Sequence, residues 1–338
     1  MSSVTVLEVA VLKSIAERFL GPDLTTVWSS RSHFSEVVCF RRRRQPDRYG
    51  LVVKRVMPWH WQTCANPEFQ MSEFNNATTH FRRQLKAHGV PVASQYNCLI
   101  ENGQMIHVSS EEGRSLHDHL LTTRPEQRQQ ILLKVVEVIT GALYQSQPVI
   151  GLDPQLTNFG TLIDTAGRVF STPYIDVVPP LCQFGQTMLV HYPNPTDPKI
   201  VAWEIERKFK PLGILRRLRF SILSIDLDLE DVFFGLLSGV VPDLYPAAQE
   251  FFDSLPDAAI KNGYSRSEVR RHIEGISLDG LDAIREVGVR LAPQQPTPRD
   301  QFLRRVFNLS RKDTSPGFEE PHAVRFERLK NELIQLVV

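Results

Sequence analysis

The sequence predicts an α+β fold with two lobes, a small antiparallel β-sheet that carries one helix and a larger, mainly helical lobe. Three observations predict it. Short β-branched and aromatic runs separated by turn residues fill residues 24–110, and the Glu-Glu-Gly at 111–113 marks a change of pattern. From there to the end, apolar residues recur mostly at helical spacing. We therefore expect an N-terminal lobe over 1–110 and a helical lobe over 111–338.

The composition is that of a globular chain and excludes several classes of protein. Lys and Arg number 39 and Asp and Glu 38, so the net charge of +1 argues against a nucleic-acid partner. No apolar run approaches the ~18 residues of a membrane span, and Glu8 and Lys13 interrupt the apolar N-terminus, which predicts an amphipathic helix. Scattered cysteines without a Cys-x-x-Cys pair favour reduced thiols and a cytoplasmic location; they are Cys39, Cys64, Cys98 and Cys182.

In the N-terminal lobe we expect a three-stranded meander, one helix and a hairpin. The helix over 72–87 has apolar or small residues at 3.6-residue spacing and ends at Gly89. The strands are expected at 24–28, 36–42, 49–57, 94–100 and 104–109, with a polar loop at 29–35 and a turn at 43–48. Arg41 to Arg44 lie at that turn and are interpreted as a solvated hairpin tip.

The second lobe is expected to begin with two helices and a hairpin. The helices cover 115–122 and 126–144, and the hairpin covers 158–163 and 168–175, with a turn at 164–167. Residues 183–199 contain Pro, Asn and Gly and predict a loop. Further helices follow to the end, interrupted by breaks at 293–298 and 312–317.

Two carboxylates and a carboxamide follow the long helix of the second lobe. Asp153 comes just after that helix, Asn158 stands at the start of a strand, and Asp176 ends the second strand of the hairpin. Mg²⁺ prefers oxygen ligands and takes one or two carboxylates, which leaves positions for phosphate oxygens and water. Asp153 followed by Pro154 is also what a simple helix-stopping turn would look like.

Lys54 stands inside the apolar strand Leu51–Val56. A half-buried lysine needs an anionic partner, and a nucleotide phosphate is a candidate. A solvated lysine on an edge strand is the alternative. Arg55 is expected on the other face of the same strand.

In this order, these motifs resemble the protein-kinase-like superfamily, in its aminoglycoside phosphotransferase and choline kinase branch. That branch has a strand lysine, a His-Gly-Asp-x-x-x-x-Asn loop and an aspartate after a hairpin, matched here by Lys54, Gly151 to Asn158, and Asp176. The resemblance implies ATP and Mg²⁺ as cofactors. It also implies that Asp153 orients or deprotonates the acceptor hydroxyl and that Asn158 and Asp176 hold the metal ion.

The resemblance also implies a wider nucleotide site. Lys54 would pair with the α- and β-phosphates, and the 29–35 loop would contact phosphate through Ser29, Ser30, Ser32 and backbone N–H groups. The segment containing Ser110 and Glu111 falls where the family grips adenine. The helix glutamate that should pair with Lys54 is expected near 77–79, and Glu73, about one turn earlier, is the candidate.

These motifs leave two functions open. The first is an ATP- and Mg²⁺-dependent phosphotransferase that acts on a hydroxyl of a small molecule, or less readily of a peptide. The second is a pseudokinase that serves as a nucleotide sensor or interaction module. Three departures support it: Gly151 replaces the family's histidine, Asp-Val-Val replaces Asp-Phe-Gly, and the helix glutamate is displaced. The retention of four residues together favours the enzyme; they are Lys54, Asp153, Asn158 and Asp176. We expect a nucleotide and a small-molecule acceptor as partners, and neither nucleic acid nor membrane.

Overall fold

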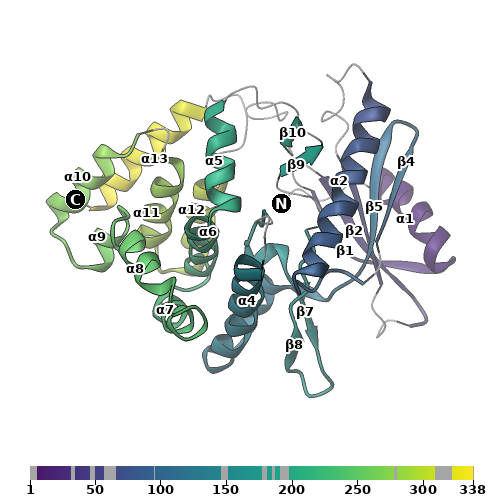
Figure 1. Ribbon diagram of the computed structural model, residues 1–338, viewed down its shortest axis with the longest axis horizontal. Coiled ribbons are helices and arrows are strands. Elements are labelled where there is room, and N and C mark those ends of the chain that lie inside the picture. Colours follow the sequence, from purple (N-terminus) through teal and green to yellow (C-terminus); the bar gives the residue numbers. More distant parts are fainter. Residues whose placement is uncertain are drawn as a thin grey trace. The chain divides into compact units, whose positions relative to one another are not determined.

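In a computed structural model the chain divides into two compact units, residues 1–214 and 215–338. Figure 1 labels their helices and strands. The expected boundary between lobes at 110/111 lies inside the first unit and stays a prediction. The structure describes residues 6–31, 35–45, 50–56, 66–94, 96–145, 151–176, 181–184, 187–190, 198–277, 280–308 and 322–337.

The first unit is built on a five-stranded antiparallel sheet with the strand order β1-β2-β3-β5-β4. Neighbours in sequence pair along a meander, and β4 lies at the edge because it forms a hairpin with β5 through Asn102 and Gly103, both with positive φ. The strands are β1 (Leu24–Arg31), β2 (Ser35–Arg42), β3 (Leu51–Val56), β4 (Tyr96–Glu101) and β5 (Gln104–Ser110).

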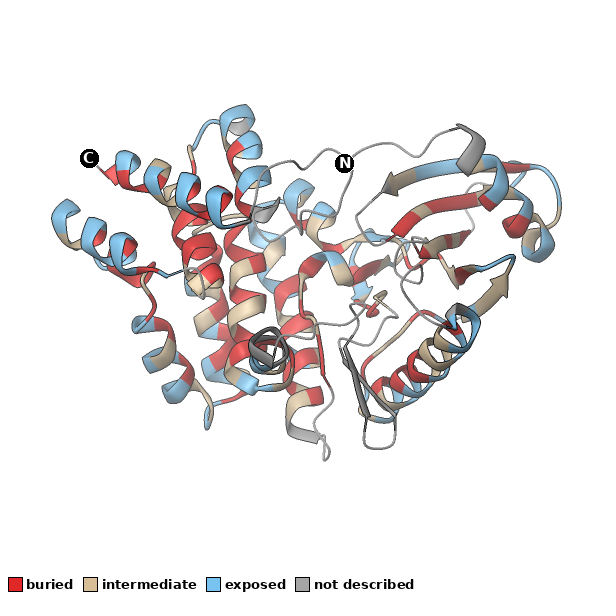
Figure 2. Cartoon of the chain, turned by 90° about the horizontal axis from the view of Figure 1, so that it is seen from above, coloured by how far each residue is buried: buried red, intermediate tan, exposed pale blue. Residues whose placement is uncertain are grey.

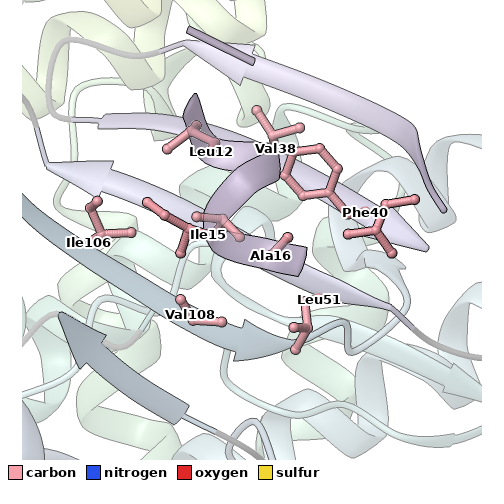
Figure 3. Close-up of a cluster of buried hydrophobic side chains, with 10 residues drawn as sticks. Leu12, Ile15, Ala16, Val38, Phe40, Leu51, Ile106 and Val108 are labelled. Atoms are coloured by element: carbon pink, nitrogen blue, oxygen red, sulfur yellow. The ribbon is translucent and has the colours of Figure 1, made fainter. Parts of the chain in front are cut away.

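Helix α1 (Val6–Leu20) covers one face of this sheet. Its buried side presents Leu12, Ile15 and Ala16, which pack against alternate residues of three strands (Figure 3). Because side chains alternate along a strand, these residues define one face of the sheet. The strand residues in this core are Val38, Phe40, Leu51, Val53, Ile106 and Val108, together with Leu24.

Helix α2 (Pro67–Ala87) lies on the opposite face (Figure 1). Met71, fully buried, packs with Val56 of β3 and Met105 of β5. The Asn66 side chain caps the start of the helix by accepting from the Phe69 N–H at 3.1 Å. Gly89, with a φ of +74°, follows its last turn as the sequence predicts.

The rest of the first unit consists of helices and short strands. A second sheet has the order β6-β7-β8. Its strands are β6 (Arg114–Ser115), β7 (Gly160–Ile163) and β8 (Val169–Ser171), and β9 (Leu181–Phe184) pairs with β10 (Thr187–Val190). The helices are α3 (Leu116–Thr122), α4 (Pro125–Gln145), the 3₁₀ turn η2 (Leu156–Asn158) and α5 (Pro198–Phe209).

The second unit is helical in its described residues. Its helices are α7 (Leu229–Val240), α8 (Tyr245–Asp253), α9 (Ala258–Lys261), α10 (Arg266–Gly275), α11 (Leu281–Leu291), α12 (Pro296–Asn308) and α13 (His322–Val337), and α6 (Pro211–Leu223) spans the boundary between the units. In Figure 2 many helices carry buried residues on one side and exposed residues on the other, as their sequence period predicts.

A buried ionic network joins the helices of the second unit. Arg219 of α6 donates to Glu230 at 2.8 Å and to Asp257 at 2.7 Å, and Arg290 donates to the same two carboxylates. Burial alone would raise the pKa of Asp257, but the two guanidinium groups hold it below its ordinary value. Each charge in this network therefore depends on its partners.

The predicted fold class, an antiparallel sheet with a helix followed by a mainly helical region, is confirmed. Two predicted loops are wrong in part. β1 continues to Arg31 because it pairs with β2 over its whole length, and 183–199 contains the end of β9, all of β10 and the start of α5. No described helix has the length and apolar character needed to cross a membrane.

Candidate functional site

Lys54 lies on the sheet face that is turned away from α1. The neighbouring Val53 belongs to the core under α1, so alternation places Lys54 on the opposite face. Its partners across the sheet are Val37 on β2 and His107 on β5. Arg55 points to the α1 face, as predicted, and forms an ion pair with the fully buried Glu36.

The ammonium group of Lys54 forms an ion pair with the carboxylate of Asp176. The Nζ–Oδ1 distance is 3.6 Å, and the two side chains are 26% and 25% exposed. The ion pair thus joins β3, which carries Lys54, to the segment after β8, which carries Asp176. Both groups keep enough exposure to meet a ligand. This proximity is the central feature of the site.

Hydrogen bonds of the backbone hold Asp176 in place. The N–H of Ile175 donates to the carbonyl of Asn158 at 2.8 Å, and the N–H of Tyr174 donates to the carbonyl of Pro91 at 2.7 Å. Tyr174 is buried against Phe159 with ring centroids 5.3 Å apart. The residue before Asp176 is therefore fixed directly to Asn158, a second predicted site residue.

The loop from Asp153 to Asn158 is closed on itself. The side-chain amide of Asn158 donates to the carbonyl of Asp153 at 3.0 Å, which leaves the amide oxygen for another partner. Gln155 donates to the carboxylate of Asp153 at 3.1 and 3.3 Å. Asp153, Asn158 and Asp176 are thus linked through one hydrogen-bonded segment, in the order that the sequence predicts.

Gly151 occupies the position where the resembled family has a histidine. A Cβ atom on Gly151 would overlap the ring of Phe209, at the end of α5. The next residue, Leu152, donates its N–H to the carbonyl of Lys208 at 2.7 Å. Helix α5 therefore holds the start of the loop, and its last aromatic ring fills the space that a side chain at 151 would need.

His107 is a site residue that the sequence analysis missed. It is 2% exposed, lies opposite Lys54, and shares a hydrogen bond of 2.6 Å between its Nδ1 and the hydroxyl of Tyr96. Burial, with the nearby charges of Lys54 and Arg82, lowers its pKa to about 3. The imidazole is therefore neutral beside the lysine. The sequence could have indicated His107 only through the register of β3 against β5, which places it opposite Lys54.

The structure does not bring every predicted residue to Lys54. Glu73 is half-buried on α2, and in the described part of the chain no ion pair joins it to Lys54. The next residue, Phe74, is the one whose ring packs edge-on against the His107 ring. Ser29 and Ser30 lie on β1, where Ser30 pairs with Val37 of β2. Val37 in turn pairs with Lys54 of β3, so one strand separates Ser30 from Lys54. Ser32 lies outside the described residues.

Ser110 and Glu111 are already engaged inside the protein. Ser110 donates to the carboxylate of Glu112. Glu111 accepts two hydrogen bonds from Arg41, at 2.7 and 2.5 Å, and one from the Gly50 N–H at 2.8 Å. Burial would raise the pKa of Glu111, but these hydrogen bonds hold it below its ordinary value. The interpretation of Arg41 as part of a solvated tip is therefore wrong.

The donor set fits a nucleotide with a divalent cation. Asp176 offers a carboxylate and Asn158 an amide oxygen, which are hard ligands that Mg²⁺ accepts, and Lys54 offers an ammonium group to phosphate. Among the described residues no group of three or more His, Cys, Asp or Glu side chains comes together. The two protein oxygens leave positions for phosphate and water oxygens in the shell of a Mg²⁺ ion.

Comparisons with known proteins give one structural likeness. No family model and no curated protein matches the chain. A solved structure with a similar chain is the kinase domain of PknI from Mycobacterium tuberculosis, in a double mutant. The match is 16% identical, covers 92% of this chain and 96% of that chain, and has a TM-score of 0.35.

Proposed function

We propose that this protein is an ATP- and Mg²⁺-dependent phosphotransferase of the protein-kinase-like type, acting on a hydroxyl of a small molecule. One observation carries the proposal: Lys54 and Asp176, selected from the sequence as phosphate-binding and metal-binding residues, form an ion pair at 3.6 Å. The link from Asp176 through Ile175 to Asn158 supports it further.

Each residue has a distinct role in this proposal. Lys54 binds the α- and β-phosphates, and Asp176 with Asn158 holds Mg²⁺, which neutralises charge on the phosphates. Asp153 accepts a hydrogen bond from the acceptor hydroxyl and orients it. Residues 1–110 supply the nucleotide-binding sheet, and residues 111–338 supply the loop, the metal ligands and the acceptor pocket. Most of the catalytic effect then comes from positioning and from charge stabilisation.

A second candidate function is a nucleotide-binding pseudokinase. Two observations favour it. Phe209 occupies the space beside Gly151, so no side chain there can orient Asp153 as the family's histidine does. Lys54 has a carboxylate partner in Asp176, whereas Glu73, the helix glutamate expected to hold it, forms no ion pair with it in the described part of the chain. Both functions require nucleotide binding, and only the first requires transfer.

Nucleotide binding is tested first by thermal unfolding. ATP with Mg²⁺ should raise the Tm of the wild type, because a ligand selective for the folded state stabilises it. Lys54→Met keeps the apolar stem and removes the charge, so it should lose most of that shift. Lys13→Met, on the exposed side of α1, is the matched control and should respond like the wild type. A wild type that responds to no nucleotide, with or without Mg²⁺, rules out both functions.

The roles of the carboxylates are tested by two isosteric changes. Asp176→Asn should weaken Mg²⁺-dependent ATP binding by about tenfold or more, because a charged ligand of the cation is lost. Asp153→Asn should leave binding nearly unchanged and lower ATP hydrolysis by about a hundredfold or more, because acceptor orientation is felt in the transition state. Titration calorimetry and a phosphate-release assay measure the two effects. ATP binding by the wild type without hydrolysis or transfer to alcohols, sugars or peptides would indicate the pseudokinase.

A further inference from the structure

A polar cavity of about 360 Å³ lies between α2 and β4, and neither Lys54 nor Asp176 is among its lining residues. Three cations line it, Arg82, Arg83 and Lys86, all from the last turns of α2. The other lining residues are neutral: Asn75, Thr79, Ser94, Tyr96, Asn97 and Cys98. A volume near the lower end of the range for small-molecule pockets suits a compact ligand.

Arg82 is the buried element of this cavity. It is 7% exposed, its Nη2 donates to the carbonyl of Ala93 at 2.8 Å, and its guanidinium lies 4.5 Å from the ring centroid of Tyr96. Its Nη1 is buried and has no hydrogen-bond partner among the described residues. Because Nη1 is closed to solvent, a ligand in the cavity would act on Arg82 through the positive charge of its guanidinium group.

The electrostatics of the cavity favour an anion. Burial lowers the pKa of Arg82, and the negative charge of Glu112 acts in the opposite direction. Burial also raises the pKa of Cys98 to about 12, so this thiol stays neutral. Tyr96 is neutral for the same reason. The described lining therefore carries positive charges and no negative charge at neutral pH.

The nearby carboxylate is already occupied. Glu112 accepts hydrogen bonds from the backbone N–H and the hydroxyl of Ser94, at 2.8 and 3.2 Å, and from the hydroxyl of Ser110. Arg83 and Lys86 are exposed and form no ion pair in the described part of the chain. Lys86 stands at the negative end of α2, which reduces its attraction for an anion and leaves Arg82 and Arg83 as the stronger contributors.

We propose that this cavity binds the phosphate group of a small phosphorylated molecule. A phosphate carries negative charge on several acceptor oxygens, which matches the guanidinium charge of Arg82 and the cations at the rim. The site is separate from the proposed nucleotide site, but the two are connected. Tyr96 stacks under Arg82 and hydrogen-bonds to His107, which lies opposite Lys54. Contacts within the protein therefore connect Arg82 to the residue opposite Lys54.

The test uses glycerol 3-phosphate as the probe and glycerol as the neutral control, at constant ionic strength. Titration calorimetry on the full chain should show binding of glycerol 3-phosphate and none of glycerol. The double variant Arg83→Gln/Lys86→Gln should weaken binding by about tenfold or more, because two charge-assisted contacts are lost. Both residues are exposed, so this variant should fold. Arg43→Gln/Arg44→Gln removes the same charge from the exposed turn after β2 and should bind like the wild type.

Three results would overturn the proposal. One is equal binding by the two double variants, which would show a non-specific charge effect. Another is loss of binding in Lys54→Met with no loss in Arg83→Gln/Lys86→Gln, which would place the phosphate at the nucleotide site. The third is a phosphoserine peptide that binds more than tenfold tighter than glycerol 3-phosphate, which would identify a protein partner in place of a small molecule. Binding by Lys54→Met at wild-type strength supports the separate site.

Discussion

The chemistry of the candidate site depends on single residues whose neighbours come from different strands. Lys54 could be selected from the sequence because a lysine inside an apolar strand is unusual. His107 could not, because its importance comes from lying opposite Lys54 and in contact with Tyr96. A histidine in an alternating strand is equally compatible with an exposed position. Only the register of β3 against β5 places an imidazole beside the lysine.

His107 should make the protein less stable in mild acid. The pKa of His107 in the folded protein, about 3, lies below the ordinary 6.5. Between these pH values the histidine is protonated in the unfolded chain and neutral in the folded chain. The stability that this pKa difference contributes is fully present above pH 6.5 and is lost as the pH falls toward 3. Between pH 7 and pH 5 the wild type should lose about 2 kcal/mol of unfolding free energy from this residue.

Denaturant unfolding of the wild type and His107→Gln at both pH values measures this contribution. The variant keeps a polar partner for Tyr96 and cannot titrate, so its pH-dependent loss should be smaller by about 2 kcal/mol. His117→Gln, at a partly exposed position on α3, is the control and should behave like the wild type. An equal loss in His107→Gln and the wild type would contradict a neutral, buried His107.

At the scale of elements, local sequence predicts segments better than it predicts their contacts. The spacing of Asp153, Asn158 and Asp176 correctly indicates a loop followed by a hairpin, because turns and strands depend on nearby residues. The role of α5 was not predictable. The segment 183–199 looks like a loop by its Pro, Asn and Gly content, whereas α5 starts at Pro198 and places Phe209 against Gly151.

The contact between Gly151 and α5 can be tested by adding one methyl group. Gly151→Ala should destabilise the protein by about 1–3 kcal/mol, because the new Cβ overlaps the Phe209 ring. Gly141→Ala is the matched control. That position lies inside α4 with open space around it, so alanine should stabilise by about 0.5–1 kcal/mol.

Combining Gly151→Ala with Phe209→Leu should recover part of the lost stability, since the smaller side chain makes room for the methyl group. Urea unfolding curves of the single and double variants measure the coupling. Strictly additive effects of the two substitutions would show that the ring and residue 151 do not compete for the same space.

At the scale of the whole molecule, the chain forms two compact units with different means of stabilisation. The first is organised by a sheet with a helix on each face, and the second by packed helices around the Arg219–Asp257 network. The division falls at residue 214, inside α6, and no composition change in the sequence marks it. The candidate nucleotide site belongs entirely to the first unit.

The two units should unfold in separate transitions. ATP with Mg²⁺ should raise the Tm of the first unit only, because that unit contains Lys54 and Asp176. Asp257→Asn should lower the Tm of the second unit only. The substitution removes a carboxylate that Arg219 and Arg290 share, which leaves buried arginine charge without full compensation. Differential scanning calorimetry distinguishes the two, and a single transition that both changes shift together would show that the units unfold as one.

By itself, the sequence determined the elements and their order: a sheet-forming first part, a Lys54 strand, the Asp153–Asn158 loop and a helical remainder. These follow from local period, turn residues and burial preference, which act within a few residues of the chain. The tertiary structure decided which distant groups meet. It paired Lys54 with Asp176 in place of Glu73, placed His107 beside Lys54, and placed β4 against the α2 cations that line the cavity. Such contacts depend on strand register and helix packing, which local sequence does not encode.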